Sequence, residues 1–157
     1  MPVYNSQARL AQINVSPGGV PKKPVPGVQI DRLGLAGDSH TYEDHGGPER
    51  AVCLYALELI EALQAEGHPI TPGAAGENLT TTGLDWSRVS PGARLQIGED
   101  VVLEVTRFTV PCKTIRAAFA AENYHRISQT EHPGWSRVYA RVVNSGFVQT
   151  GDAITIL

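Results

Sequence analysis

The stretch of sequence that decides the fold class is RLQIGEDVVLEVTRFTV, residues 94–110. It holds two β-prone runs, RLQIG and VVLEVTRFTV. The segment at residues 71–86, TPGAAGENLTTTGLDW, shows the same pattern of short runs broken by Gly and Pro. Several short strands with turn residues between them are what a barrel or a sandwich requires. The sequence therefore predicts a mainly β fold with a few helices.

The N-terminal third adds two extended segments and one long polar loop. Residues 10–15 and 28–35 are predicted to be strands. Between them lies SPGGVPKKPVPG, in which seven of twelve residues are Gly or Pro, and such a segment excludes a helix or a central strand. Residues 34–50, GLAGDSHTYEDHGGPER, show no period and are crowded with polar groups. A long polar loop of this kind is usually functional or disordered.

Two helical segments and a final set of strands complete the prediction. Apolar residues recur at helical spacing over residues 50–66, and Gly67 follows as a stop signal. Residues 112–121 are also predicted to be helical. Residues 136–143 form a predicted strand, and a turn at residues 144–146 leads into a hairpin and one further strand by residue 157.

The composition describes one turn-rich domain. With 157 residues the chain is too short for two ordinary domains, so residues 1–157 are predicted to form one. Sixteen glycines, eleven prolines and only 18% charged residues nearly exclude a helical bundle, since typical domains have about 25% charged residues. Ten Arg and three Lys are scattered, and the formal charge is −3. This balance predicts no nucleic-acid partner, while the excess of Arg hints at a phosphate or carboxylate ligand.

The two cysteines, Cys53 and Cys112, exclude a disulfide scaffold, a four-thiolate zinc site and a cysteine-held iron–sulfur cluster. The first ten residues, MPVYNSQARL, lack the features of a signal peptide. No run approaches the roughly 18 apolar residues of a membrane helix. We therefore expect no membrane association and a reducing cytoplasm.

Cys112 is the most informative single residue. It follows a predicted strand and Pro111, and it starts a predicted helix with Lys113 beside it. A helix N-terminus and nearby cations favour the thiolate, which is a nucleophile or a soft metal ligand. The alternative is a buried structural cysteine. Cys53 lies within the apolar pattern of residues 50–66, so it is predicted to be a core residue.

A cluster of polar residues occupies the long loop. Its members are Asp38, His40, Glu43, Asp44 and His45, followed by Gly46 and Gly47. Two histidines and three carboxylates can bind a divalent metal or perform acid–base chemistry. The five-residue spacing of the histidines fits no established zinc pattern, so an exposed polar loop is the alternative. The glycine pair indicates a sharp turn or a close backbone approach.

Two further segments carry weaker signals. GAAGENL, residues 73–79, contains Glu77 and Asn78 in a glycine-rich setting, which is either a simple turn or a cradle for an anion. On a strand, Trp135, Arg137 and Arg141 would share one face. That face is either a stacking wall that binds anions or an ordinary solvated surface.

The order of these motifs resembles the MOSC domain family, named after the C-terminal domain of molybdenum cofactor sulfurases. The resemblance rests on HGG followed by a basic residue, on GENL, on Pro-Cys at a strand end and on GWSRVYARVV, and it extends from about Ser16 to the end. The stand-alone bacterial members are the most similar. The resemblance implies a distorted β-barrel and binding of a molybdenum–pterin cofactor (molybdopterin).

The resemblance also implies roles for particular residues. Cys112 would be the thiolate that ligates molybdenum or carries sulfur. Fixed donors and cations for the pterin's phosphate and pyrimidinone edge would come from Arg50, Asn78, Lys113, Arg137 and Arg141. The pocket around the metal would be shaped by His45, Gly46, Gly47, Glu77 and Asn78. Asp44 and His45 would donate and accept protons.

Three hypotheses about function follow. The first is an oxidoreductase that reduces N-hydroxylated substrates, such as modified bases, with electrons from a separate reductase. The second is a carrier, in which Cys112 holds a persulfide or the cofactor and passes it on, with a cysteine desulfurase as partner. The third is a divalent-metal hydrolase that uses Asp38, His40, Asp44 and His45. The chain has no room for the desulfurase domain of full-length cofactor sulfurases, and the oligomeric state stays open.

Overall fold

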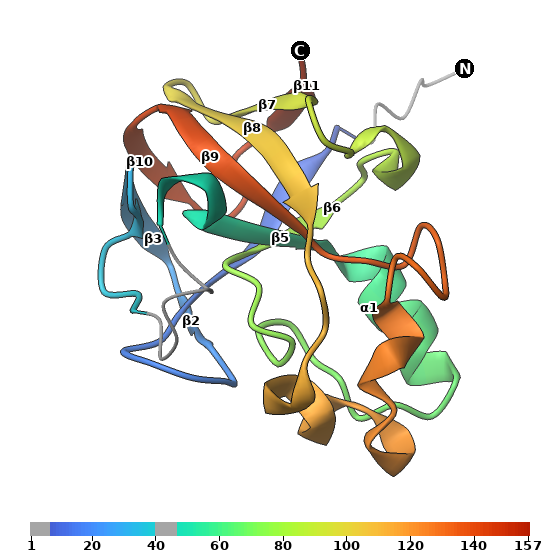
Figure 1. The fold of residues 1–157 in the computed structure, drawn as a ribbon. Coiled ribbons are helices and arrows are strands. Elements are labelled where there is room, and N and C mark those ends of the chain that lie inside the picture. Colours follow the sequence, from blue (N-terminus) through green and yellow to red (C-terminus); the bar gives the residue numbers. More distant parts are fainter. Residues whose placement is uncertain (1–6, 40–46) are drawn as a thin grey trace, which may run out of the picture.

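The fold was analysed in a computed structural model that describes residues 7–39 and 47–157. The decisive stretch forms an antiparallel pair, β7 (Arg94–Ile97) and β8 (Val101–Phe108). Eight strands make one sheet in the order β11-β7-β8-β9-β5-β6-β1-β2 (Figure 1). The remaining bounds are β1 Arg9–Val15, β2 Lys23–Val25, β5 Val52–Ala56, β6 Leu79–Thr82, β9 Val138–Asn144 and β11 Ile154–Ile156. The predicted mainly β class is confirmed.

The large sheet curls until β1 approaches the residues just before β11. An isolated bridge joins Arg9 to Ala153, and the Leu10 amide donates to the carbonyl oxygen of Asp152 at 2.9 Å. A separate three-stranded sheet, in the order β10-β3-β4, comprises β10 Gly146–Gln149, β3 Gly27–Asp31 and β4 Gly34–Leu35. No continuous ladder runs around the barrel, which agrees with the distorted type expected.

The helix predicted over residues 50–66 is wrong in its first half. Residues 52–56 form strand β5, and helix α1 extends only over Leu57–Ala65. All five residues of β5 are buried, so the strand lacks the polar alternation that marks a half-exposed strand. Cys53 therefore lies on a strand, while Gly67 follows the helix with φ +101° as expected.

Strand β5 separates two apolar layers. Val52 and Leu54 belong to the core inside the barrel, whereas Tyr55 packs in a second cluster with Ile60 and Leu63 of α1. Successive side chains of a strand point to opposite faces. Cys53 consequently shares the outer face of β5 with Tyr55, on the side where the barrel is covered by α1 and the short helices.

The segment after Cys112 is helical but tighter than an α-helix. It forms the 3₁₀ helices η4 (Lys113–Ala118), η5 (Ala120–Glu122) and η6 (Tyr124–Ile127), with Cys112 as the N-cap residue of η4. Two further 3₁₀ turns are η2 (Pro48–Arg50) and η3 (Trp86–Arg88). Within residues 7–39 and 47–157, no helix is long and apolar enough to cross a membrane.

The C-terminal hairpin expected after residue 143 is wrong. Strand β10 pairs with β3 in the small sheet, and the next strand, β11, pairs with β7. Strand β9 pairs with β8 from Val138 to Asn144 and with β5 from Val138 to Ala140. One edge of β9 is therefore occupied along the whole strand and is closed to a hairpin partner.

Candidate functional site

A cavity of about 320 Å³ lies on the outer face of β5 and β9. Six chain segments that are separated in sequence contribute to its wall. The lining residues are Gly19, Val20, Lys22, Ser39, Cys53, Ala75, Gly76, Asn78, Val110, Cys112, Thr114, Ile115, Arg137 and Tyr139. Both cysteines of the chain, and two of the cations, therefore face one space.

Backbone pairing explains why three polar residues lie side by side on the cavity floor. Cys53 is directly opposite Tyr139 in the antiparallel β5–β9 pair. The Cys53 amide donates to Asn78 Oδ1 at 3.0 Å, and the Asn78 amide donates to the Cys53 carbonyl oxygen at 2.8 Å. Asn78, Cys53 and Tyr139 thus form one row across neighbouring strands, as cross-strand neighbours do.

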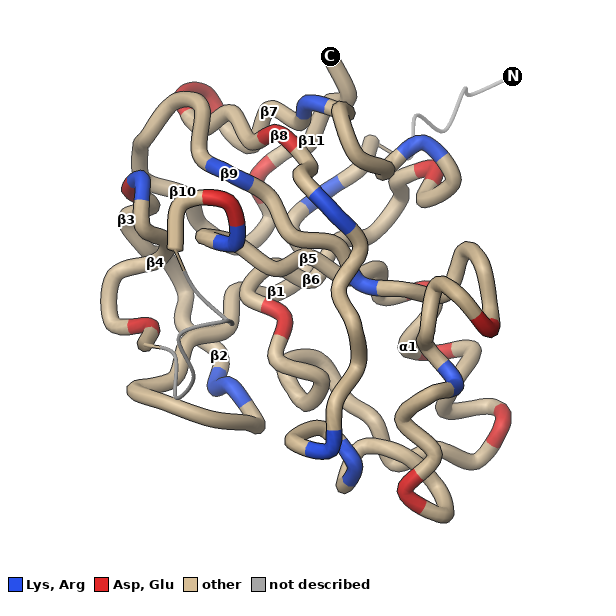
Figure 2. Tube along the Cα trace, viewed as in Figure 1, with Lys and Arg blue, Asp and Glu red and all other residues tan. Residues whose placement is uncertain are grey.

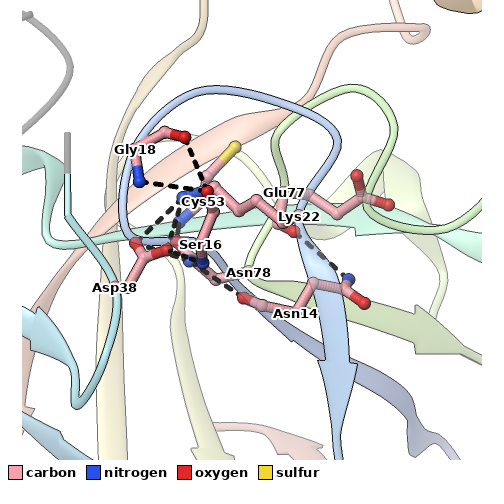
Figure 3. Close-up of polar contacts among 8 residues, drawn as sticks. All are labelled: Asn14, Ser16, Gly18, Lys22, Asp38, Cys53, Glu77 and Asn78. Atoms are coloured by element: carbon pink, nitrogen blue, oxygen red, sulfur yellow. Dashed lines mark hydrogen bonds and ion pairs between the residues drawn. The ribbon is translucent and has the colours of Figure 1, made fainter. Parts of the chain in front are cut away.

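The Asp38 carboxylate joins three parts of the cavity wall (Figure 3). Lys22 Nζ donates to its two oxygens at 2.7 and 2.9 Å, and both side chains are almost fully buried. The Ser16 amide donates to Asp38 Oδ1 and Asn78 Nδ2 donates to Asp38 Oδ2, each at 3.0 Å. Asp38 therefore fixes the glycine-rich loop before Lys22 and the Asn78 side chain in one arrangement.

Glu77 is fully buried next to this network but does not line the cavity. Its Oε2 accepts a hydrogen bond from Thr80 Oγ1 at 3.1 Å, and its carbonyl oxygen accepts one from Asn14 Nδ2 at 3.2 Å. Its Oε1 has no hydrogen-bond partner among the residues that the structure describes. Figure 3 shows the carboxylate directed away from Asp38. Burial raises the pKa of Glu77 from 4.5 to about 6, although hydrogen bonds and the Arg137 charge oppose the shift.

This raised pKa predicts a pH-dependent stability. Because folding raises the pKa of Glu77 from 4.5 to about 6, the stabilising contribution is fully present below pH 4.5. It is lost as the pH rises through 6, and it amounts to about 2 kcal/mol. We expect Glu77→Gln to remove this decline when urea unfolding is measured at pH 4.5 and pH 7. An equal decline in wild type and Glu77→Gln would contradict the assignment.

The two thiols of the cavity differ in environment. Cys112 is partly buried, and its Sγ lies 2.8 Å from Thr114 Oγ1 in a hydrogen bond. Cys53 is only 5% exposed, and burial raises its pKa to about 11 even though the Arg137 charge lowers it. Cys53 therefore stays a neutral thiol at physiological pH. The prediction of a buried Cys53 is confirmed, but its position on a cavity was not anticipated.

Two cavity residues lie at the start of β9: Tyr139 belongs to the strand, and Arg137 directly precedes it. The Arg137 side chain is 7% exposed, and its Nη1 donates to the carbonyl oxygen of Ala75. Burial raises the pKa of Tyr139 to about 12, so its phenol remains protonated and able to donate a hydrogen bond. The Arg50 guanidinium lies 5.8 Å from the centre of the Tyr139 ring.

Other residues expected at the site lie elsewhere or outside the described residues. Arg141 forms an ion pair with Glu104 at 2.9 Å, and Trp135 packs under the Arg126 guanidinium at 4.0 Å, so these two do not form a cavity wall with Arg137. Some expected site residues are described but do not line the cavity: Gly47, Arg50, Glu77, Lys113 and Arg141. Those that lie outside the described residues are His40, Glu43, Asp44, His45 and Gly46.

The hydrolase hypothesis depends on a metal site that includes Asp38. The Asp38 carboxylate is occupied by Lys22, Ser16 and Asn78. Across the described ranges 7–39 and 47–157, no group of three His, Cys, Asp or Glu side chains is arranged to hold a metal ion. The described geometry thus gives Asp38 a structural role as the partner of Lys22.

Sequence reasoning missed Lys22 and Tyr139 as cavity residues. Lys22 stands in a Gly- and Pro-rich segment that has no periodicity, so nothing local indicates that its side chain is buried. Tyr139 had a usable signal, since it follows Arg137 by two residues and shares its face of the predicted strand. Recognition of residues 52–56 as a strand would have placed Cys53 opposite it.

Comparison with known proteins agrees with this fold. The chain is 35% identical over 129 residues to a reductase of Gibberella moniliformis (79% of this chain, 22% of the reductase). It is 30% identical over 142 residues to the uncharacterized protein YflK of Bacillus subtilis (88% of this chain, 63% of YflK). The chain thus spans less than two thirds of either relative.

A solved structure has the same fold. The crystal structure of YiiM from Geobacillus stearothermophilus matches with a TM-score of 0.69 and 25% identity, covering 96% of this chain and 75% of YiiM. The family model described as MOSC domain matches residues 41–155. Because that match covers well over half of the 157 residues, this protein belongs to the MOSC domain family.

Proposed function

We propose that this chain binds the molybdenum cofactor (molybdopterin) in the cavity, with Cys112 as the thiolate ligand, and reduces N-hydroxylated compounds. MOSC domains are associated with this cofactor, and one relative is named a reductase. The observation that carries the proposal is that Cys112, Asn78 and Arg137 line one cavity. A separate reductase supplies the electrons, and the chemistry takes place in a reducing cytoplasm.

The described residues fit such a group. The cavity of about 320 Å³ falls in the usual range for small-molecule sites. Cys112 offers a soft sulfur ligand of the kind that suits a thiophilic metal. Within the described part of the chain, Nε of the buried Arg137 guanidinium has no hydrogen-bond partner, and Asn78 presents an amide at the floor. Cation, amide and thiol together match a ligand that carries an anion, a polar ring edge and a metal.

The protonation states of the polar groups define their roles in the proposal. Cys53 remains protonated because burial raises its pKa to about 11, which leaves Cys112 as the thiol able to serve as a metal ligand. Tyr139 retains its proton because burial raises its pKa to about 12, so its phenol can donate a hydrogen bond to a bound oxygen. Asp44 and His45 stay predictions for the proton donors.

The overall reaction is a two-electron reduction. The N–O bond of the substrate breaks as two electrons from the external donor are added; one proton completes the amine N–H and the other converts the released hydroxyl to water. When bound, the cofactor supplies a metal that accepts oxygen and is reduced again by external electrons. The chain's own residues exclude bulk water from the cavity, orient the ligand and deliver protons.

Molybdenum content tests the proposal directly. Protein is produced in a host that makes the cofactor, and metal is measured in wild type, Cys112→Ser and Cys53→Ser. We expect wild type and Cys53→Ser to retain molybdenum and Cys112→Ser to lose nearly all of it. Equal molybdenum in wild type and Cys112→Ser would rule out the ligand assignment. Reduction of an N-hydroxylated base with an added electron donor then tests the reaction itself.

A sulfur or cofactor carrier is the second candidate, and one feature favours it. Val110, two residues before Cys112, is 85% exposed at the rim of the cavity, where a partner protein can approach the thiol. Incubation with a cysteine desulfurase and cysteine, followed by intact-mass measurement, separates the two candidates. An added sulfur atom on Cys112 without turnover of N-hydroxylated substrate supports the carrier, and no added sulfur argues against it.

A further inference from the structure

Helix α1 ends in a turn that directs one histidine at the short helices η4 and η5. The amides of Gly67 and His68 donate to the carbonyl oxygens of Gln64 and Leu63, at 2.9 and 3.1 Å. This is the Schellman arrangement, which closes a helix in a defined geometry. The His68 ring packs against Phe119 with ring centres 5.5 Å apart, and its side chain is only 10% exposed. The end of α1 therefore fixes the position of this imidazole.

The imidazole of His68 accepts a hydrogen bond from the backbone. The amide of Ala120, the first residue of η5, donates to His68 Nδ1 at 3.0 Å. A ring nitrogen accepts only when it carries no proton, so this contact requires the neutral ring with its proton on Nε2. A proton on Nδ1 would bring two N–H donors together. The contact therefore exists in only one charge state of His68.

The segment that this contact holds has a strained backbone. Ala121 and Glu122 have φ +55° and +56°, in the left-handed region that residues with a Cβ rarely adopt. Such a conformation persists only where the surrounding contacts impose it. Ala120 directly precedes the two residues, so its bond to His68 is one of the contacts that impose it. Loss of that bond favours a rearrangement of η5.

The short helices also form one wall of the cavity. Thr114 and Ile115 of η4 line the cavity together with Cys112, and Cys112 Sγ is hydrogen-bonded to Thr114 Oγ1 at 2.8 Å. Phe119 ends η4 and is also the N-cap residue of η5, so the two helices share it. A rearrangement of η5 is therefore passed to the wall that carries the Cys112 thiol.

The charged groups around the imidazole offer the protonated ring no replacement for this contact. Glu66 Oε1 lies 3.7 Å from His68 Nε2, but both Glu66 oxygens already accept from Arg126, at 2.9 and 2.7 Å. Figure 2 shows charges of both signs on the segments beside α1. Besides Glu66 and Arg126, the charged or titratable residues on these segments are His132, which acts on Glu66 through space, and the ion pair of Arg116 with Glu122.

We propose that His68 is a positioning residue for the cavity wall that carries Cys112. The neutral ring holds η5 through the Ala120 amide, and protonation releases that amide and lets η4 and η5 move away from the cavity. Histidine ordinarily gains its proton between about pH 8 and pH 5, so Cys112 becomes more accessible as the pH falls through this range. The consequence for a bound cofactor rests on the proposed function, whereas the movement of the wall does not.

The rate at which dithiodipyridine reacts with Cys112 in cofactor-free protein measures this movement. The adduct is quantified by peptide mass spectrometry, so that reaction at Cys53 is counted separately. His68→Asn is the reference variant, because its amide oxygen keeps an acceptor for the Ala120 amide and does not titrate. The thiol's own dependence on pH is common to both proteins. The ratio of the wild-type rate to the His68→Asn rate therefore reports the state of the contact.

We expect this ratio to rise about fivefold between pH 8 and pH 5, the factor that corresponds to the loss of one net hydrogen bond. His125→Asn is the matched control, since His125 is exposed and lies 3.5 Å from Glu131. It should show the same dependence on pH as wild type. A ratio that does not change with pH, or a loss of the dependence in His125→Asn, would overturn the proposal.

A measurement on wild type covers the case in which His68→Asn does not fold. Hydrogen exchange at the Ala120 amide, corrected for its intrinsic dependence on pH, should lose about fivefold of its protection as the His68 ring gains its proton. Protection of the Leu54 amide in β5 should stay constant. Unchanged protection of Ala120 would contradict the inference.

These outcomes are separate from those that test the proposed function. A constant rate ratio together with unchanged protection of Ala120 refutes the role of His68 alone, because the labelling and exchange experiments contain no cofactor. Equal molybdenum in wild type and Cys112→Ser refutes the proposed function alone, because the bond between Ala120 and His68 does not depend on a ligand in the cavity.

Discussion

Asp38→Ala is expected to lower the free energy of unfolding by about 3–5 kcal/mol, the range found when one partner of a buried ion pair is removed. The Lys22 ammonium, 7% exposed, would lose the two oxygens that lie 2.7 and 2.9 Å from Nζ. The Ser16 amide and Asn78 Nδ2 would also lose their acceptor. Urea unfolding followed by circular dichroism measures the loss.

Two controls test whether the loss of stability arises from the burial of the Lys22–Asp38 ion pair. Arg116 and Glu122 form an ion pair at 3.1 Å in which both side chains are more than half exposed, and Arg116→Met should cost less than about 1 kcal/mol. The double variant Lys22→Met with Asp38→Leu removes both charges and should recover much of the loss. If Asp38→Ala cost no more than Arg116→Met, the pair would not have the structural role assigned to it.

Gly73→Ala is expected to destabilise the protein by about 2–5 kcal/mol, as the sum of backbone strain and overpacking. Gly73 has φ +87°, and an added Cβ would lie 2.5 Å from the carbonyl oxygen of Lys22 and 3.2 Å from Asn14 Cγ. The two segments cannot separate easily, because the Lys22 amide donates to the Gly73 carbonyl oxygen at 3.0 Å.

Gly92 provides the matched control for this substitution. Its φ of +95° is nearly the same, but nothing lies within 4 Å of an added Cβ. Gly92→Ala should therefore cost only the strain of a left-handed conformation, about 1–2 kcal/mol. The difference between the two variants in thermal or urea unfolding reports the clash alone. Equal losses would show that Gly73 is not closely packed against the segment of Lys22.

The sequence predicted those elements that are marked by a pattern of neighbouring residues. Strands β1, β7 and β8 alternate or end at Gly and Pro, so residues 94–110 identified the fold class. Strand β5 was mistaken for helix because both of its faces are buried, and burial on the second face depends on α1. The pairing of β10 with β3 is a contact between segments more than a hundred residues apart, which no local pattern encodes.

The residues of the candidate site likewise divide into those that a sequence motif indicated and those that only the structure revealed. Cys112 and Asn78 were recognisable from their motifs, and the structure brings both to one cavity. Lys22 was not recognisable, because its burial depends on Asp38, sixteen residues further along the chain. Arg137 and Arg141 were equivalent in the sequence. The structure distinguishes them: Arg141 is ion-paired with Glu104, whereas Arg137 is buried and lines the cavity.

The order of strands in the large sheet also constrains when the cavity can exist during synthesis. Strand β5 is flanked by β9, which is made much later, and by β6. Arg137 and Tyr139 follow Cys53 by more than eighty residues, so a nascent chain lacks one wall of the cavity until β9 has been made. Distant pairings of this kind form late and slowly. We therefore expect a ligand of this cavity to be acquired only once β9 has paired with β5.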